Sequence, residues 1–278
     1  MYPLRIILAA FGLIWAGCTT AADAPPLSIK GEWIQGGILR GQVAPGHEVR
    51  VNDEVIDVGP DGEFVFGLGR DEPETVTLAV IGQSLDWHKT YEVARKTYNI
   101  QRVEGVPQQT VNPSEAQRKR TQKEAEKVWL ARQTQRSSLD YMQTFQWPLL
   151  GPISGVYGSQ RFYNGEPRRP HYGVDIARPT GTKVVAPAAG LVTLAEPDLF
   201  YSGGTLIIDH GHRLSSTFLH LSKLHVEVGQ EVEQGALLGE VGASGRATGP
   251  HLDWRMNWRD RRVDPTTLVG PMPDWQAQ

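Results

Sequence analysis

The sequence lacks several features that would assign it to a common class of hydrolase. Its 278 residues include a single cysteine, Cys18, so no intrachain disulfide can form. It contains no Gly-x-Ser-x-Gly segment, which argues against a serine hydrolase with a nucleophile elbow. It also contains no His-Glu-x-x-His segment, which argues against a zinc protease whose ligands share one helix. Any catalytic site has to be built in another way.

The sequence also lacks a marked excess of charge of either sign. Lys and Arg number 28 and Asp and Glu 31, a net charge of −3, which gives no electrostatic reason to expect a nucleic acid as partner. Hydrophobic residues make up 40% and charged residues 21%, as in globular rather than disordered proteins. A chain of this length can form two domains with separate cores.

Residues 1–24 have the features of a secretory signal peptide. Arg5 precedes an apolar stretch from Ile6 to Trp15 that is too short to cross a bilayer as a permanent helix, and small residues follow it. We therefore expect an exported protein of the periplasm or cell envelope. Cys18 lies where a bacterial lipoprotein would carry its lipid, whereas ordinary cleavage a few residues later would remove it. Only lipidation of Cys18 would attach the chain to a membrane.

Residues 27–102 are predicted to form a small β-sandwich. Short apolar runs such as Glu48–Val51 and Glu63–Phe66 are separated by turn sequences such as Pro45-Gly46 and Pro60-Asp61-Gly62. Repeated short strands with such turns are typical of a sandwich. Because no cluster of catalytic residue types occurs here, we expect a spacer or targeting module.

Residues 103–145 are predicted to be a linker that contains a helix. Helix formers and opposite charges at helical spacing occupy residues 113–136. The apolar stripe of this helix is narrow, chiefly Ala125, Val128 and Trp129, which predicts a solvated connecting helix. Glutamates alternate with its basic residues, so we expect it to bind neither nucleic acid nor membrane.

Residues 146–270 are predicted to form one antiparallel β domain with its site in a groove. Apolar runs such as Lys183–Val185, Gly190–Leu194 and Thr205–Ile208 are separated by glycine-rich turns. Three segments of this part concentrate histidine or carboxylate side chains: Pro170–Asp175, Phe218–Leu221 and Pro250–Trp254.

The last of these segments has the alternation of a half-buried strand. Its large apolar side chains would face the core: Leu252, Trp254, Met256 and Trp258. The opposite face would then carry the polar ones: His251, Asp253, Arg255 and Asn257. A histidine and a carboxylate two residues apart on an open strand face can bind one metal ion together. Taken alone, such alternation more often marks a solvated face.

His171 and Asp175 can share a metal ion only if the chain turns between them. In an extended strand their side chains would be about 13 Å apart, whereas metal–ligand bonds are about 2 Å long. Pro170 and Gly173 provide backbone conformations that allow such a turn. As an isolated pattern, His-x-x-x-Asp is weak.

His220 lies in a run in which Thr217, Leu219 and Leu221 alternate with Phe218 and His220. This alternation lets His220 point toward the groove while its neighbours pack. A lone histidine of this kind is more often structural, and His220 gains significance only from the other two segments. Surface or structural roles are expected for the remaining histidines: His47, His88, His210, His212 and His225.

Together, the three segments resemble the lysostaphin-type, or LytM-domain, zinc peptidases, which cut peptidoglycan cross-links. The resemblance covers most of residues 150–268 and also includes Ala186–Gly190. It implies that His171 and Asp175 are metal ligands. It further implies that His220 and His251 are catalytic histidines that do not bind the metal.

One position departs from the family pattern. The family's third ligand is the second histidine of a His-x-His pair, and this sequence has Asp253 there. A carboxylate oxygen is an ordinary zinc ligand with a reach similar to that of histidine Nδ1. We therefore expect His171, Asp175 and Asp253 to bind Zn²⁺. Two carboxylates predict a weaker Lewis acid, with a bound water whose pKa is less depressed than in a histidine-rich site.

The resemblance thus implies a zinc-dependent endopeptidase that hydrolyses peptide cross-links of bacterial peptidoglycan. His220 and His251 would orient the water, move its proton and stabilise the oxyanion. The alternative is a non-catalytic LytM-domain regulator that binds and activates another cell-wall hydrolase, and Asp253 is the reason to consider it. The completeness of the other four positions favours the enzyme. The expected partners are peptidoglycan and, for the alternative, other cell-wall enzymes.

Overall fold

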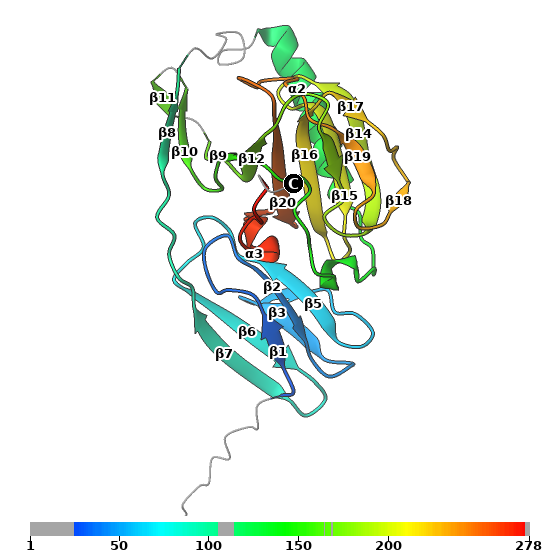
Figure 1. Ribbon diagram of the computed structural model, residues 1–278. Coiled ribbons are helices and arrows are strands. Elements are labelled where there is room, and N and C mark those ends of the chain that lie inside the picture. Colours follow the sequence, from blue (N-terminus) through cyan, green and yellow to red (C-terminus); the bar gives the residue numbers. More distant parts are fainter. Residues whose placement is uncertain (1–24, 105–113, 164, 168, 276–278) are drawn as a thin grey trace, which may run out of the picture.

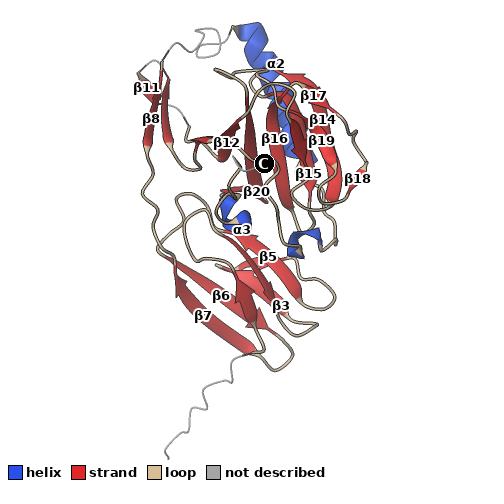
Figure 2. Cartoon of the chain, viewed as in Figure 1, coloured by secondary structure: helices blue, strands red, loops and turns tan. Residues whose placement is uncertain are grey.

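The computed structural model describes residues 25–104, 114–163, 165–167 and 169–275 (Figure 1). The predicted signal peptide and Cys18 lie outside these residues. The fold is mainly β, as predicted, and the helical segments are few (Figure 2). A β-sandwich is followed by a helix and then by an antiparallel β domain. Within the described ranges, no helix is both long enough and apolar enough to cross a membrane.

Two sheets form the N-terminal sandwich. The first has the order β1-β2-β5: Ser28–Lys30, Ile38–Gln42 and Glu63–Gly67. The second has the order β4-β3-β6-β7: Glu54–Ile56, Glu48–Val51, Thr75–Ile81 and Asp86–Glu92. Alternation decides which side chains enter the core, as in β3, where Val49 and Val51 are buried and Glu48 and Arg50 are not.

One large antiparallel sheet dominates the C-terminal part. Its order is β18-β14-β15-β16-β20-β12-β9: Glu231–Val232, Gly190–Leu199, Gly203–Asp209, Leu214–Leu221, His251–Trp258, Gly173–Ala177 and Ile153–Gly155. The strand β21 (Arg261–Val263) also pairs with β20. A smaller sheet has the order β13-β19-β17: Lys183–Val185, Leu237–Glu240 and Lys223–Leu224. The predicted core face of β20 is confirmed, since Leu252, Trp254, Met256 and Trp258 are all buried.

A third small sheet joins segments that are far apart in the sequence. It has the order β11-β10-β8: Glu166–Pro167, Gln160–Tyr163 and Ile100–Val103. β8 pairs in parallel with β10. The chain leaving the sandwich therefore runs alongside the C-terminal part before the connecting helix begins (Figure 1).

The connecting helix α2 (Glu115–Ala131) begins with a capping box. The Ser114 hydroxyl accepts a hydrogen bond from Gln117 N–H, and the Gln117 side chain accepts one from Ser114 N–H. No residue of α2 is buried, in agreement with the narrow stripe. Val128 and Ala131 nevertheless pack against a small apolar cluster on strands β14 and β15. The helix therefore lies along one face of the large sheet.

The sandwich packs against the C-terminal part through β5, β20 and β21. A Cβ atom on Gly67 would lie 2.6 Å from Cγ1 of Val263, so the two parts approach closely here. Glu54 accepts hydrogen bonds from Arg259 at 2.5 Å and Arg261 at 2.8 Å. One continuous cluster of buried apolar residues includes members from both parts. The short helical segments η1 (Asp140–Met142) and α3 (Thr266–Val269) lie near this junction (Figure 2).

Candidate metal centre

Strand pairing places two buried carboxylates opposite each other. Asp175 in β12 is the register partner of Asp253 in β20. Their exposed fractions are 6% and 1%. Like charges directly opposite on one sheet face are destabilising, and desolvation increases the cost. This pair therefore requires positive charge close by.

Two glycines on neighbouring strands make room for these carboxylates. A Cβ atom on Gly155 of β9 would lie 2.2 Å from Oδ2 of Asp175, and one on Gly173 of β12 would lie 2.4 Å from Oδ1 of Asp253. Real Cβ atoms do not approach so closely, so any larger residue would displace the carboxylates. The glycines are thus part of the architecture of the cluster.

His171 completes a group of three potential metal ligands. It is 1% exposed and lies just before β12, and its ring meets Asp175, so the chain is not extended between the two residues, as predicted. Its Nε2 atom is 3.0 Å from Oδ1 of Asp175. One ligand atom each from His171, Asp175 and Asp253 lie within 4.8 Å of one another.

The hydrogen bonding of this group fits a metal site. Both ring nitrogens of His171 and Oδ1 of Asp175 are buried, yet they make no hydrogen bond of acceptable geometry. Buried polar atoms are normally satisfied. A histidine nitrogen and carboxylate oxygens that converge in this way form a donor set that Zn²⁺ accepts. The three residues present therefore fit a zinc ion.

Two arginines that are not themselves potential metal ligands donate hydrogen bonds to the two carboxylates. Arg161 on β10 donates to Oδ2 of Asp175 at 2.6 Å. Arg255 donates to both oxygens of Asp253, at 2.9 Å from Nε to Oδ1 and 2.5 Å from Nη2 to Oδ2. Burial raises the pKa of Asp253, but Arg255 and His171 outweigh it and hold that pKa well below its usual range. Asp253 is therefore held as a carboxylate, the form that binds metal.

The pKa of Asp175 is set by a closer balance of effects. Burial and the neighbouring Asp253 both raise it, whereas His171 and Arg161 lower it. The lowering effects prevail, so the pKa of Asp175 also lies below its usual value.

His220 reaches the site through an unusual backbone conformation. Its φ of 64° is in the left-handed region, which is uncommon for a residue other than glycine. Thr217 and Leu219 face the groove side of β16, so strict alternation would direct His220 to the other side. Thr217 and Leu219 are buried, as expected, but the left-handed backbone of His220, and not the alternation of its strand, brings its ring beside His251.

His220 and His251 lie together beside the ligand group. Their ring centroids are 4.8 Å apart, and Nε2 of His251 is 3.9 Å from Oδ1 of Asp175. Nδ1 of each ring is 2.8 Å from a backbone carbonyl oxygen, of Ser244 for His220 and of Gly249 for His251. Because a carbonyl only accepts, Nδ1 carries a hydrogen in both rings, and Nε2 is the nitrogen that faces away from the carbonyl.

Burial also keeps His220 neutral. It is 6% exposed, and burial lowers the pKa of His220 to about 4, although Asp253 opposes this effect. At neutral pH its ring can therefore accept a hydrogen bond or a proton at Nε2, but holding the proton is unfavourable.

The structure brings all five predicted site residues into one cluster: His171, Asp175, His220, His251 and Asp253. Arg161 and Gly155 carried no recognisable signal in the sequence. Arg255 did, since it shares a strand face with Asp253. The histidines that we expected to be structural or at the surface lie outside the cluster. His210, for example, is fully buried between Ala189 O and the Ser216 hydroxyl.

Comparisons with known proteins relate this chain to peptidases. Residues 169–265 match the family model of peptidase family M23. The peptidoglycan DD-endopeptidase ShyA of Vibrio cholerae is 37% identical over 118 residues, which cover 39% of this chain and 27% of ShyA. The DD-carboxypeptidase/endopeptidase Mpg of Neisseria meningitidis is 35% identical over 106 residues, which cover 38% of this chain and 24% of Mpg. The chain thus spans about a quarter of the length of these curated relatives.

A solved structure matches over most of the chain. It is a Pseudomonas aeruginosa crystal structure assigned to peptidase M23, with a TM-score of 0.67 and 30% sequence identity. The match covers 86% of this chain and 96% of that one. The similarity therefore includes the sandwich and the helix as well as the domain that holds the cluster.

Proposed function

This chain belongs to peptidase family M23, and we propose that it is a zinc-dependent endopeptidase that hydrolyses peptide cross-links of bacterial peptidoglycan. The observation that carries the proposal is the buried group of His171, Asp175 and Asp253 with two histidines at its side. The substrate class follows from the relatives, which are named for action on peptidoglycan or as DD-endopeptidases.

We assign zinc to His171, Asp175 and Asp253. Bound there, the ion would supply Lewis acidity toward the scissile carbonyl and would lower the pKa of a water molecule. Arg161 and Arg255 hold the two carboxylates in position through hydrogen bonds. Such outer contacts orient metal ligands and are costly to remove.

The two remaining histidines divide the work of proton transfer. His251 lies beside the ligand group with Nε2 3.9 Å from Oδ1 of Asp175, and its Nδ1 contacts the carbonyl oxygen of Gly249, so Nε2 faces the site. We therefore assign His251 as the residue that takes the proton of the attacking water and passes it to the leaving amine. His220 stays neutral because of its burial, and we assign it to orient the water through Nε2.

One observation favours the regulator as a second candidate. Arg255 engages both oxygens of Asp253, so this carboxylate is neutralised even without a metal. A carboxylate has about four lone-pair sites, which leaves room for a metal as well. The unsatisfied atoms of His171 and Asp175 favour the enzyme.

We also propose that the protein is exported to the periplasm or cell envelope, because ShyA is named as a peptidoglycan endopeptidase and peptidoglycan lies outside the cytoplasm. In this proposal residues 1–24 are the signal peptide, and the domains are 27–102 and 146–270, joined by the linker 103–145.

The test is digestion of purified sacculi by the zinc-loaded chain, with and without a chelator, with products identified by mass spectrometry. We expect release of peptides cut at cross-links, abolished by the chelator and by His251→Ala. Equal release with the chelator would refute the metal mechanism. A chain that retains no zinc and cuts nothing, but binds another cell-wall hydrolase tightly, would favour the regulator.

A further inference from the structure

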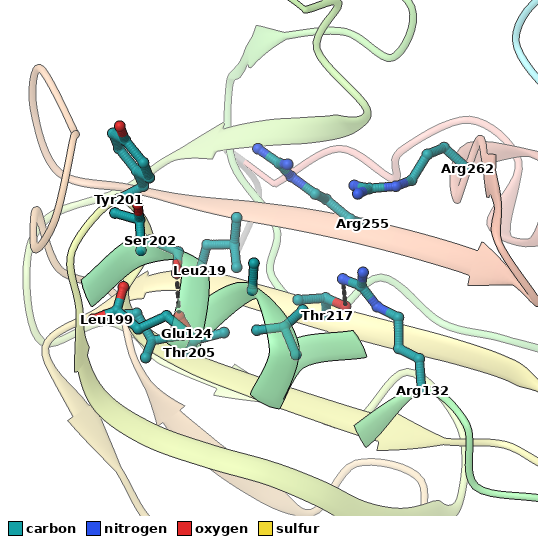
Figure 3. Close-up of a pocket in the computed structure, with 13 residues that line it drawn as sticks. Glu124, Arg132, Leu199, Tyr201, Ser202, Thr205, Thr217, Leu219, Arg255 and Arg262 are labelled. Carbon is teal, nitrogen blue, oxygen red and sulfur yellow. Dashed lines mark hydrogen bonds between the residues drawn. The ribbon is translucent and has the colours of Figure 1, made fainter. Parts of the chain in front are cut away.

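A cavity of about 260 Å³ lies beside the metal centre, between α2 and the groove face of the large sheet (Figure 3). Leu219 and Thr217 of β16 line it and are the register partners of Asp253 and Arg255. The cavity is therefore directly adjacent to a proposed metal ligand. Its volume is below the roughly 300–1,000 Å³ of sites for drug-sized ligands, which suits one residue of a peptide.

The lining of this cavity is apolar on one side and cationic on the other. Val128, Leu199 and Leu219 provide aliphatic surface. The cationic side is formed by three arginines from three elements: Arg132 at the end of α2, Arg255 in β20 and Arg262 in β21 (Figure 3).

The three arginines differ in their partners. Arg255 is paired with Asp253. Arg132 donates to the Thr217 hydroxyl at 3.2 Å, and its Nε is buried without a hydrogen bond. Arg262 lies 5.3 Å from the centre of the Tyr172 ring. Among the described residues, no carboxylate forms an ion pair with Arg132 or Arg262.

Among the described residues that line the cavity, a single one is acidic, and both of its carboxylate oxygens already accept hydrogen bonds. Glu124 accepts a hydrogen bond from Arg120 at 2.6 Å through Oε1 and one from Phe200 N–H at 2.9 Å through Oε2. It therefore contributes little negative charge to the arginine side.

The arginines also destabilise one another as cations. Burial lowers the pKa of Arg132 to about 9, and the charges of Arg262 and Arg255 add to this effect, whereas Asp260 opposes it. Burial, with Arg255, likewise lowers the pKa of Arg262 to about 10. Like charges held together in a partly desolvated space are costly unless an anion joins them. Such unfavourable clusters occur preferentially at functional sites.

We propose that Arg132, Arg255 and Arg262 form a subsite that binds a carboxylate of the substrate peptide, close to the bond that is cut. This inference rests on the proposed function and narrows the substrate to peptides with a free carboxylate near the scissile bond. A guanidinium fork matches a carboxylate in shape and charge. The apolar side of the cavity accommodates the aliphatic part of the same residue.

Binding can be measured separately from hydrolysis in the His251→Ala background. The ligands are cross-linked muropeptide dimers, either native or with their carboxylates converted to amides. Calorimetry on the zinc-loaded full chain would compare Arg132→Gln and Arg262→Gln with Arg118→Gln, an exposed arginine on the same helix. Arg132→Lys and Arg262→Lys keep the charge in case the glutamine variants fold poorly, which thermal unfolding would reveal.

Native dimers should bind at least about tenfold more tightly than amidated ones, the effect of one or two charged hydrogen bonds. Each glutamine variant should bind native dimers about tenfold more weakly and amidated dimers with unchanged affinity. The lysine variants should lose less affinity for native dimers, and Arg118→Gln should lose none. The subsite would be refuted if native and amidated dimers bound with equal affinity or if native dimers did not bind. It would also be refuted if the glutamine variants lost the same affinity for both ligands. Carboxylate-selective binding by a chain that hydrolyses nothing would refute the proposed function alone, and unselective hydrolysis would refute the subsite alone.

Discussion

Replacing Gly155 by alanine should displace Asp175 and weaken zinc binding. The new Cβ atom would lie 2.2 Å from Oδ2 and 2.8 Å from Cγ of Asp175, so the atoms must separate by roughly 1 Å to reach ordinary contact. The carboxylate cannot move away freely, because its Oδ2 atom accepts a hydrogen bond from Arg161 at 2.6 Å. Its strand β12 is also paired on both edges, by β20 and β9.

The structure allows the size of this effect to be bounded. Disturbing the contacts that orient a ligand costs roughly 10- to 100-fold in metal affinity. Overpacking a filled interior costs about 1–3 kcal/mol of stability. We therefore expect the zinc Kd to rise by about 10- to 100-fold. The Tm of the metal-free protein should fall by roughly 2–12 °C, at 2–4 °C per kcal/mol.

The assay is competition for zinc against a chromogenic chelator, together with thermal unfolding in excess chelator. Gly69→Ala is the matched control, since its Cβ would meet only Oε2 of Glu72, at 3.4 Å. Gly173→Ala applies the same test to Asp253, whose Oδ1 would lie 2.4 Å from the new Cβ. Unchanged zinc affinity in Gly155→Ala would mean that Asp175 is not a ligand. Unchanged affinity in Gly173→Ala alone would exclude Asp253.

Three further outcomes are expected. Asp253→His should retain or raise zinc affinity in the same competition assay, and loss of zinc would mean that the third ligand lies elsewhere. Burial lowers the pKa of His210 from 6.5 to about 4, so between these values only the unfolded state takes up the proton. The unfolding free energy should therefore fall by up to about 3 kcal/mol as the pH drops through this range. Chemical denaturation should show a smaller fall in His210→Gln, and an identical pH profile would contradict this assignment. Glu54→Gln should cost about 1 kcal/mol, because it weakens the pairs with Arg259 and Arg261 between the two parts of the chain. This loss should shrink in high salt, whereas a loss independent of salt would point to packing instead.

Local patterns were sufficient to predict much of the fold. The runs Glu48–Val51 and Lys183–Val185 coincide with β3 and β13. The alternation of β20 predicted its core face, because period-two burial is a property of the strand itself. The narrow apolar stripe likewise predicted a helix without buried residues.

Features that depend on distant segments could not be predicted in this way. Ile100–Val103 pairs with Gln160–Tyr163, and nothing in either segment indicates the other. Gly155 and Arg161 lie at the candidate centre only because of strand register and the position of β10. His220 depends on a left-handed backbone conformation that breaks the alternation of its own strand. A single sequence carries no direct signal for contacts of this kind.

The substitution of aspartate for histidine at position 253 has to be judged together with Arg255. A neutral histidine ligand carries no charge, and Asp253 paired with Arg255 carries none in sum. Arg161 likewise offsets the charge of Asp175. We expected a weaker Lewis acid because of the negative charge of the two carboxylates. That expectation did not include the positive charge of Arg161 and Arg255. Because a metal responds to the whole local charge and not only to its ligands, the arginines would bring the proposed site closer to a histidine-rich one. In the proposed site, the identity of residue 255 should therefore affect the chemistry as well as that of residue 253.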